Sequence, residues 1–446
     1  MPRRIDNPYA PGFGYTPPAM IGREHPFGEL ETGLVRVTHG MAEQVRLYSG
    51  VRGTGKTALL NEFGVHARNE GAWVIAVEAN RDGDPFPQML NTLQDYIDTA
   101  SADARIGRGV RNAVSRLDSV GVGSFGFNAR IRLNTRPDTH NAQDRATALG
   151  GALVAAATVA HSRNSAVVLT IDEMQAMPGE QMRALFPALQ EVNRNFIDPG
   201  QGTRMPVLTV FAGLPNTRDV IRDEAGTYAA RLDHQQLIML EDAEVARALA
   251  VPASDQGVAW DQEALESAVD AAAGYPYATQ VVGSECWNAA AARDETDRRI
   301  TAADAHHGIG EARAQLANVY EDQLRTLPQR ERRYLDAVAS LPDDQRSSSR
   351  IAAILGGPAS HWGDARARLI DRGLLSSPAR GQVTIADRGL EQHLQHHSEP
   401  NPPTPQQIAR QSFPATGRSN TGPHSRPQTP QRPPQRDRRN DPGLER

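Results

Sequence analysis

The sequence predicts an α/β protein with a parallel five-stranded sheet, followed by a helical lid, a winged helix-turn-helix and a disordered tail. From residue 44 onward strand-like and helix-like segments alternate, which is typical of a parallel sheet covered by helices. The three central strands are short apolar runs, as expected for strands buried on both faces. A glycine-rich segment joins the first strand to a helix, a connection that this fold class uses at its binding site. The strands we expect are 44–49, 72–78, 166–171, 207–212 and 235–240.

The glycine-rich segment is a complete G-x-x-x-x-G-K-[ST] phosphate loop, and Lys56 within it is the only lysine among 446 residues. A compact ammonium fits between the β- and γ-phosphates where a planar guanidinium does not. Backbone amides of residues 53–57 would point at the phosphates, and the Thr57 hydroxyl would hold Mg²⁺. The alternative is a glycine-rich turn that happens to precede a helix. The nucleotide-binding residues expected here are Gly50, Val51, Arg52, Gly53, Thr54, Gly55, Lys56, Thr57 and Ala58.

A second apolar strand, residues 165–171, ends in two carboxylates. This is the Walker B pattern, in which Asp172 reaches Mg²⁺ and Glu173 polarises the attacking water. Two exposed carboxylates at a helix start are the alternative.

Two further residues are candidates for the same site. Asn216 follows the strand 207–212, where it would sense the γ-phosphate or serve as a plain turn residue. Arg231 ends a helix before the fifth strand, where it would act as an arginine finger across a subunit boundary or as a salt-bridged surface arginine.

The chain divides into an irregular segment 1–20, a nucleotide-binding domain 21–240, a helical lid 241–316, a winged unit 317–397 and a tail 398–446. A helix is expected to open at Ile21-Gly22-Arg23-Glu24 and run toward Thr38, and residues 242–295 read as wholly helical. Apolar residues alternate over 119–134, which predicts a β-hairpin that is either a structural insert or a binding element.

These residues together resemble the AAA+ superfamily, on the branch holding the origin-recognition-type initiators and the STAND signalling ATPases. Gly22-Arg23-Glu24 is similar to that branch's N-terminal motif, which lies near the adenine. Asp172-Glu173 resembles its Walker B motif. Gly274-Tyr275-Pro276-Tyr277 resembles the Gly-x-Pro motif of its lid, where Pro276 would pack near the nucleotide. The resemblance covers about residues 7–397 and implies ATP and Mg²⁺ as cofactors, ATP hydrolysis and a nucleotide-dependent homo-oligomer.

The chain departs from that family in three ways. Ala278 and Thr279 stand where the lid usually carries an arginine, which favours a STAND-like or simple switch. The segment 119–134 does not belong to a minimal AAA+ core. No tandem repeats follow the winged region.

The C-terminal unit resembles a winged helix-turn-helix. We expect helices at 324–339, at 349–355 and from 358 to about 371, then a ribbon over 376–385 with Arg380 at its tip. Arg366 and Arg368 on the third helix and Arg380 in the wing would contact DNA. The unit carries 11 arginines against 10 acidic residues, a weak excess for a domain that reads DNA. A protein-interaction or autoinhibitory module is therefore the alternative.

Composition limits the remaining classes. The single cysteine, Cys286, excludes an internal disulfide and a cysteine metal cluster, fits a reducing cytoplasm, and is expected to be packed in a helix. No signal peptide and no apolar run of about 18 residues is present, so no membrane span is expected. The tail holds 11 of the 31 prolines and should be disordered. It would add weak affinity for nucleic acid, bind a protein partner as polyproline helix, or act as a solvated extension.

The function predicted is ATP-driven switching or loading in association with DNA. Two alternatives remain open: a STAND-like signalling ATPase that does not bind DNA, and a nucleotide-binding scaffold that barely hydrolyses ATP.

Overall fold

The computed structural model describes residues 3–12, 15–101, 142–293, 297–377, 379 and 381–397. Within them the nucleotide-binding domain is built on five parallel strands in the order β2-β3-β6-β1-β7. This confirms the predicted fold class. The strands are β1 (Arg46–Ser49), β2 (Trp73–Glu78), β3 (Val167–Asp172), β6 (Val207–Gly213) and β7 (Asp233–Gln236).

The fifth strand differs from the expected 235–240. Arg46 of β1 pairs with Asp233, and the register ends at Ser49 with Gln236. Beyond that pair the chain leaves the sheet, because the Leu240 amide donates a hydrogen bond to the Gly274 carbonyl (2.8 Å). The apolar residues 237–240 therefore connect the sheet to the lid.

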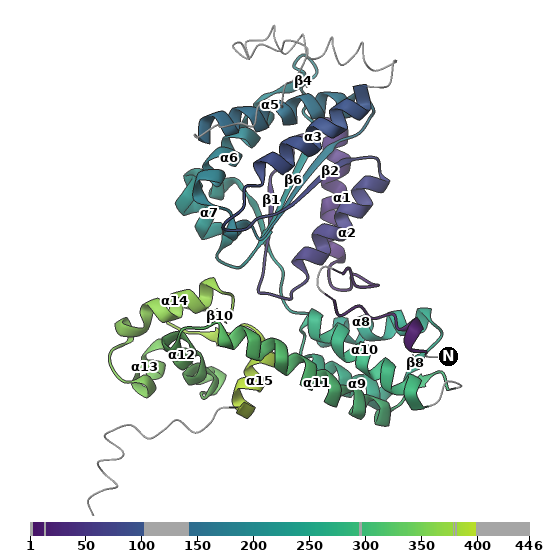
Figure 1. Ribbon diagram of the computed structural model, residues 1–446, viewed down its shortest axis with the longest axis vertical. Helices are drawn as coiled ribbons and strands as arrows, with labels where there is room; N and C mark the ends of the chain where they lie inside the picture. The colour runs from purple at the N-terminus through teal and green to yellow at the C-terminus, as the bar shows by residue number, and fades with distance from the viewer. Residues whose placement is uncertain are drawn as a thin grey trace, which may run out of the picture. The chain divides into compact units, whose positions relative to one another are not determined.

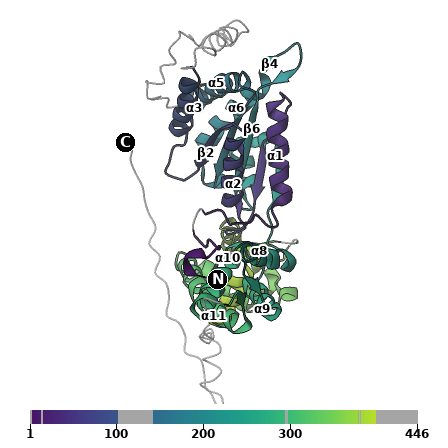
Figure 2. The same cartoon turned by 90° about the vertical axis from the view of Figure 1, so that its right-hand side faces the viewer.

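Helices cover both faces of the sheet (Figure 1). One face packs Tyr48, Val168 and Val210 against α1 and α2, while the other packs Leu47, Leu169 and Phe211 against α3, α5 and α6. Neighbouring strand residues thus enter different cores, as the two-residue repeat of a strand requires. Figure 2 shows α1 and α3 on opposite sides of the strands. The helices are α1 (Glu24–Thr38), α2 (Lys56–Asn69), α3 (Phe86–Ser101), α5 (Ala142–His161), α6 (Gly179–Arg194) and α7 (Thr217–Ala225).

The hairpin expected at 119–134 lies outside the described residues. A different short ribbon, which the sequence did not suggest, is formed by β4 (Phe196–Asp198) and β5 (Thr203–Arg204). Its Arg204 guanidinium lies 3.9 Å from the centre of the Phe196 ring, a cation–π contact.

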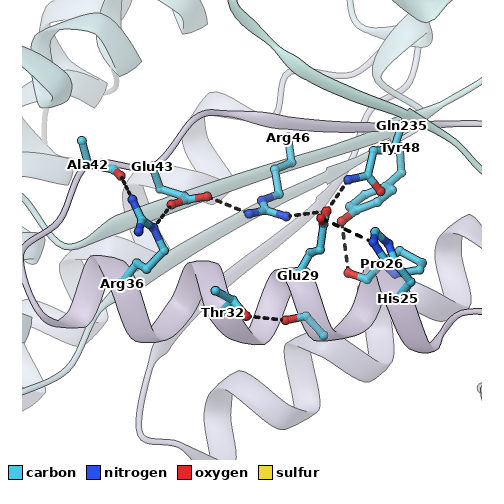
Figure 3. Close-up of polar contacts among 11 residues, drawn as sticks. His25, Pro26, Glu29, Thr32, Arg36, Ala42, Glu43, Arg46, Tyr48 and Gln235 are labelled. Carbon is cyan, nitrogen blue, oxygen red and sulfur yellow. Dashed lines mark hydrogen bonds and ion pairs between the residues drawn. The ribbon is translucent and has the colours of Figure 1, made fainter.

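A polar network fastens α1 to β1 and β7 (Figure 3). Arg46 is buried in β1 and donates to Glu43 (2.7 Å) and Glu29 (3.2 Å). Arg36 also donates to Glu43 (2.7 Å), and Gln235 of β7 donates to Glu29. Because Arg46 has two carboxylate partners, its buried positive charge is neutralised by ion pairs.

The lid is mainly helical. It comprises α8 (Asp242–Asp255), α9 (Gln262–Ala272), α10 (Pro276–Arg293) and the long α11 (Ala302–Arg325), which crosses the boundary expected at 316. The expectation that 242–295 is wholly helical is wrong at β8 (Ala259–Trp260). Gly257, with φ of 72°, follows the end of α8, and β8 then pairs with β9 (Arg299–Ile300).

The lid core also takes in the N-terminal segment and the only cysteine. Cys286 is fully buried in α10, as expected. Among the described residues before residue 20, only Arg4–Asp6 form a helical turn (η1), yet Tyr9 is buried among lid residues. Its hydroxyl donates to the Leu249 carbonyl (2.5 Å) and accepts from the Trp260 indole (3.2 Å).

The C-terminal unit has one more helix than expected. The first helix begins at Gln329 rather than 324, because α11 ends at Arg325 and Pro328 occupies the position before the new helix. The two-stranded ribbon starts one residue earlier than expected and ends at Ile385 as expected, and a further helix, α15, follows it. The elements are α12 (Gln329–Ala339), α13 (Ser348–Leu355), η5 (Ala359–Trp362), α14 (Gly363–Asp371), β10 (Leu375–Ser376), β11 (Thr384–Ile385) and α15 (Arg388–His397).

The tail from residue 398 lies outside the described residues. No helix in the described part of the chain combines the length and the apolar content that a membrane span needs.

Candidate nucleotide-binding site

The phosphate loop connects β1 to α2 in the way the motif requires. Gly53 and Gly55 have φ of 76° and 86°, in the left-handed region that favours glycine. The Gly50 amide donates to the Gly213 carbonyl (3.1 Å), which ties the start of the loop to the end of β6. Lys56 then begins α2, so the loop amides lie at a helix N-terminus, where anions bind favourably.

The Lys56 side chain folds back into the phosphate loop. Its ammonium is buried and donates to the carbonyls of Gly50 (2.9 Å) and Val51 (2.8 Å). Burial lowers the pKa of this ammonium, while the carboxylates of Glu173 and Asp172 act in the opposite direction. Two of its three N–H groups are engaged, and one is left to reach an anion.

Thr57 and Asp172 meet across the loop. The Thr57 hydroxyl donates to Asp172 Oδ2 (2.5 Å), and Asp172 Oδ1 accepts from the Glu173 amide (2.8 Å). A hydroxyl beside a carboxylate is a donor set that suits Mg²⁺, which binds few protein ligands together with substrate phosphates. No cluster of three or more His, Cys, Asp or Glu suited to a metal occurs within the described ranges.

Glu173 adopts a strained backbone conformation at the end of β3. Its φ is 51°, unusual for a residue other than glycine, and such strain tends to occur at functional sites. The Gln175 amide donates to Glu173 Oε2 (2.5 Å), while Gln175 Oε1 accepts from the Leu214 amide (2.9 Å) and the Thr217 hydroxyl (3.1 Å). Gln175 thus ties Glu173 to the segment that follows β6.

Sequence reasoning missed Gln175. The only signal available was a polar residue two positions after the carboxylate pair, and its hydrogen-bond partners lie about 40 residues further along the chain.

Arg23 supports the loop from outside. Its buried guanidinium donates to the carbonyls of Thr54 (2.9 Å) and Ile238 (2.7 Å). Gly22, with φ of 73°, packs so closely that an added Cβ would lie 2.5 Å from Leu240 Cδ2. Arg23 lines the cavity described next, whereas Gly22 does not.

The lid supplies another wall. Pro276 begins α10, and the ring of the preceding Tyr275 lies against Gly53, where an added Cβ would be 2.1 Å from Tyr275 Cε2. Burial raises the pKa of the Tyr275 phenol, which stays neutral. A cavity of about 410 Å³ lies between these elements, within the usual range for ligand sites. Its lining includes Arg52 through Ala58, Glu173, Tyr275 through Tyr277, and Tyr15 of the N-terminal segment.

Several expected site residues do not line this cavity: besides Gly22, these are Gly50, Val51, Asp172, Asn216 and Arg231. The Asn216 amide donates to Asp371 Oδ1 of α14 (3.3 Å), so it is directed toward the C-terminal unit. Arg231 is exposed at the end of the turn η3 (Gly226–Arg231) and forms no ion pair within the part of the chain that the structure describes.

The arginines expected to contact DNA are partly engaged. Arg366 donates to the Ser377 hydroxyl (2.7 Å), and Arg368 lies 3.7 Å from the buried carboxylate of Glu331. Arg380 lies outside the described residues.

Comparisons with known proteins agree with this geometry. Residues 19–201 match the model of an AAA ATPase domain. The chain carries an AAA ATPase domain. Nucleotide binding and ATPase activity belong to that domain. Residues 317–394 match a domain of unknown function, DUF8462, and no curated protein sequence matches the chain.

Two solved structures resemble this chain over most of its length. The ORC2 protein of Aeropyrum pernix, in ADPNP–ADP complexes, is 14% identical with a TM-score of 0.52, covering 86% of this chain and 95% of its own. A Walker-type ATPase of Pyrococcus abyssi is 15% identical with a TM-score of 0.53, covering 84% and 96%. At these identities the likeness is one of fold, and it extends beyond the ATPase domain into the C-terminal half.

Proposed function

We propose that this AAA+ ATPase binds ATP with Mg²⁺, hydrolyses it and uses the cycle as a conformational switch. One observation carries the proposal: the Thr57 hydroxyl meets Asp172 at 2.5 Å, with Lys56 and Glu173 lining the same cavity. Phosphoryl transfer depends mostly on positioning and on stabilising negative charge, and these are the groups that do both.

Each residue has a role in this proposal. Lys56 and the loop amides hold the β- and γ-phosphates. Thr57 and Asp172 hold Mg²⁺, which neutralises phosphate charge when bound. Glu173, held by Gln175, accepts a hydrogen bond from the attacking water and draws off its proton.

The lid would couple the nucleotide to the rest of the chain. Tyr275 packs on Gly53 of the loop, and Val319 and Gln323 of α11 line the cavity. A ligand shifts such an equilibrium only through its different affinities for the two states, so ATP and ADP must favour different lid positions.

Assembly and location are part of the same proposal. A nucleotide-dependent homo-oligomer would bring the exposed Arg231 to a neighbour's γ-phosphate, whereas Asn216 would need to leave Asp371 to act as a sensor. The single buried Cys286 fits a reducing cytoplasm.

Two versions of the switch differ in their partner. In the DNA-associated version, a loader or initiator, the winged unit contacts DNA through Arg366, Arg368 and Arg380. In the signalling version the unit contacts protein. This version is favoured because Arg368 lies beside Glu331 and Arg366 donates to Ser377, so both arginines already have partners within the unit. DNA binding that weakens steeply with salt supports the first version, and ATP-dependent oligomers without DNA affinity support the second.

The test of hydrolysis is Glu173→Gln, with Glu180→Gln as the matched control. Glu180 is an exposed residue in the first turn of α6, seven positions after Glu173. Each change therefore removes one negative charge from the same part of the ATPase domain. We expect Glu173→Gln to abolish phosphate release while ATP still binds, and Glu180→Gln to behave as the unchanged protein. Equal phosphate release from all three proteins would leave a nucleotide-binding scaffold as the better account.

A further inference from the structure

A second cavity, of about 540 Å³, lies in the C-terminal unit and takes no part in the nucleotide site. It is lined by Gln329, Arg330 and Arg333 of α12, by His361 and Trp362 of η5, and by Gly356. Its chemistry is therefore cationic and aromatic, with no carboxylate in the lining.

The two arginines both lie close to one indole, that of Trp362. The Arg330 and Arg333 guanidinium carbons lie 5.3 Å and 5.6 Å from the centre of the Trp362 ring. Trp362 is nearly buried and its indole donates to the Gly356 carbonyl (3.1 Å), so the ring is a fixed wall. Cation–π contacts hold the guanidinium groups in place at little cost to their hydrogen-bonding capacity.

Neither guanidinium has a carboxylate partner among the described residues within 4.0 Å. Arg330 spends one N–H on the His361 carbonyl. The nearest acid on the helix, Glu331, is buried and faces Arg372 (3.2 Å) and Arg368 (3.7 Å) instead. The positive charge at the cavity is therefore not neutralised from within this part of the unit.

The helix adds to that charge. α12 is 11 residues long, begins at Gln329, and has no side-chain cap on its first amides. Uncapped amides at a helix N-terminus favour an anion, and two guanidinium forks offer several donors from different directions. A phosphate group presents at least two unesterified oxygens in a tetrahedral arrangement, so it can accept hydrogen bonds from both guanidinium groups at once.

We propose that the cavity formed by Arg330, Arg333, His361 and Trp362 binds a phosphate group. The phosphate group belongs either to the backbone of a nucleic acid or to a free phosphorylated small molecule. The nucleic-acid alternative rests on the DNA-associated version of the proposed function. Arg366 and Arg368 do not line this cavity.

The test compares Arg330→Ala/Arg333→Ala with the control Arg183→Ala/Arg222→Ala, whose arginines lie in exposed ion pairs of the ATPase domain. Both double variants remove two positive charges. The first arm measures fluorescence anisotropy of labelled duplex DNA at several salt concentrations. The second arm titrates pyrophosphate and follows tryptophan fluorescence. All proteins in this arm carry Lys56→Ala, which disables the phosphate loop. Adding Trp362→Phe shows whether the fluorescence change comes from Trp362.

If the source is nucleic acid, the Arg330/Arg333 variant binds DNA about 10- to 100-fold more weakly and its log–log salt slope falls by about 2, while the control changes little. If the source is a free phosphate, DNA is unaffected and the pyrophosphate signal disappears only in the Arg330/Arg333 and Trp362 variants. An unchanged response in both arms would overturn the inference. ATP turnover measured on the same variants separates that outcome from a failure of the ATPase proposal, since neither arginine lines the nucleotide cavity.

Discussion

Replacing Gln175 with alanine should slow ATP hydrolysis and leave ATP binding nearly unchanged. The Gln175 amide holds Glu173 at 2.5 Å, and its oxygen accepts from the Leu214 amide (2.9 Å) and the Thr217 hydroxyl (3.1 Å). Gln175 does not line the nucleotide cavity, whereas Glu173 does.

The magnitude follows from those contacts. A hydrogen bond to a charged group contributes about 1.5–3 kcal/mol, and leaving the buried Leu214 amide unpaired costs about 1–3 kcal/mol. We therefore expect the free energy of unfolding to fall by about 2.5–6 kcal/mol. A general base that loses its orientation forfeits part of a 10²–10⁴-fold contribution, so kcat should fall about 10- to 100-fold. The Kd for ATP should change by less than about threefold.

The assay is phosphate release under saturating ATP, together with ATP affinity measured by calorimetry. Gln88→Ala is the control, since Gln88 is an exposed glutamine that does not line the nucleotide cavity and whose side-chain amide donates to the Ala76 carbonyl (3.1 Å). Unchanged kcat in Gln175→Ala, or an ATP affinity that falls in step with kcat, would refute the reasoning.

Two other predictions concern the phosphate loop and the C-terminal unit. Gly53→Ala should weaken ATP binding at least about 10-fold, because its Cβ would lie 2.1 Å from the Tyr275 ring at a φ of 76°. Gly71→Ala is the control, since Gly71 has a φ of 84° and open space around it, so this change introduces the backbone strain alone. Equal losses of ATP affinity in the two variants would contradict the packing argument. Burial raises the pKa of the Asp387 carboxyl from 3.8 to about 6. The folded protein thus holds this proton more tightly than the unfolded chain, so the contribution of Asp387 to the free energy of unfolding is greatest below about pH 4 and is lost as the pH rises through about 6. Asp387→Asn, which keeps an oxygen for the Gly389 amide (2.8 Å), should stabilise the protein at pH 7 by about 1–3 kcal/mol in urea unfolding and flatten this pH dependence; an unchanged pH profile would count against it.

The sequence predicted the elements whose signal is local. The phosphate loop needs only glycines, one lysine and a hydroxyl at fixed spacing, and the inner strands are continuous apolar runs. The edge strand β7 was misplaced because Asp233 through Gln236 are polar, as an edge allows, while the apolar residues 237–240 serve the connection to the lid.

Features that depend on tertiary partners were not predictable. Tyr9 stands in a proline- and glycine-rich segment, yet its burial depends on lid residues about 240 positions away. The charge of Arg368 is visible in the sequence, but its proximity to Glu331 depends on how α12 and α14 pack. Gln175 gained a role only because the segment after β6 lies beside η2 (Met174–Ala176).

Labelling of the single lysine side chain tests the central claim most directly. An acyl-phosphate ATP probe that transfers its group to nearby amines should modify Lys56, the only lysine in the chain, as read by peptide mass spectrometry. We predict that excess ATP with Mg²⁺ protects Lys56 and that the inactive Thr57→Ala variant loses part of this protection. Labelling of Lys56 that ATP does not reduce would contradict the assignment of this cavity as the ATP site.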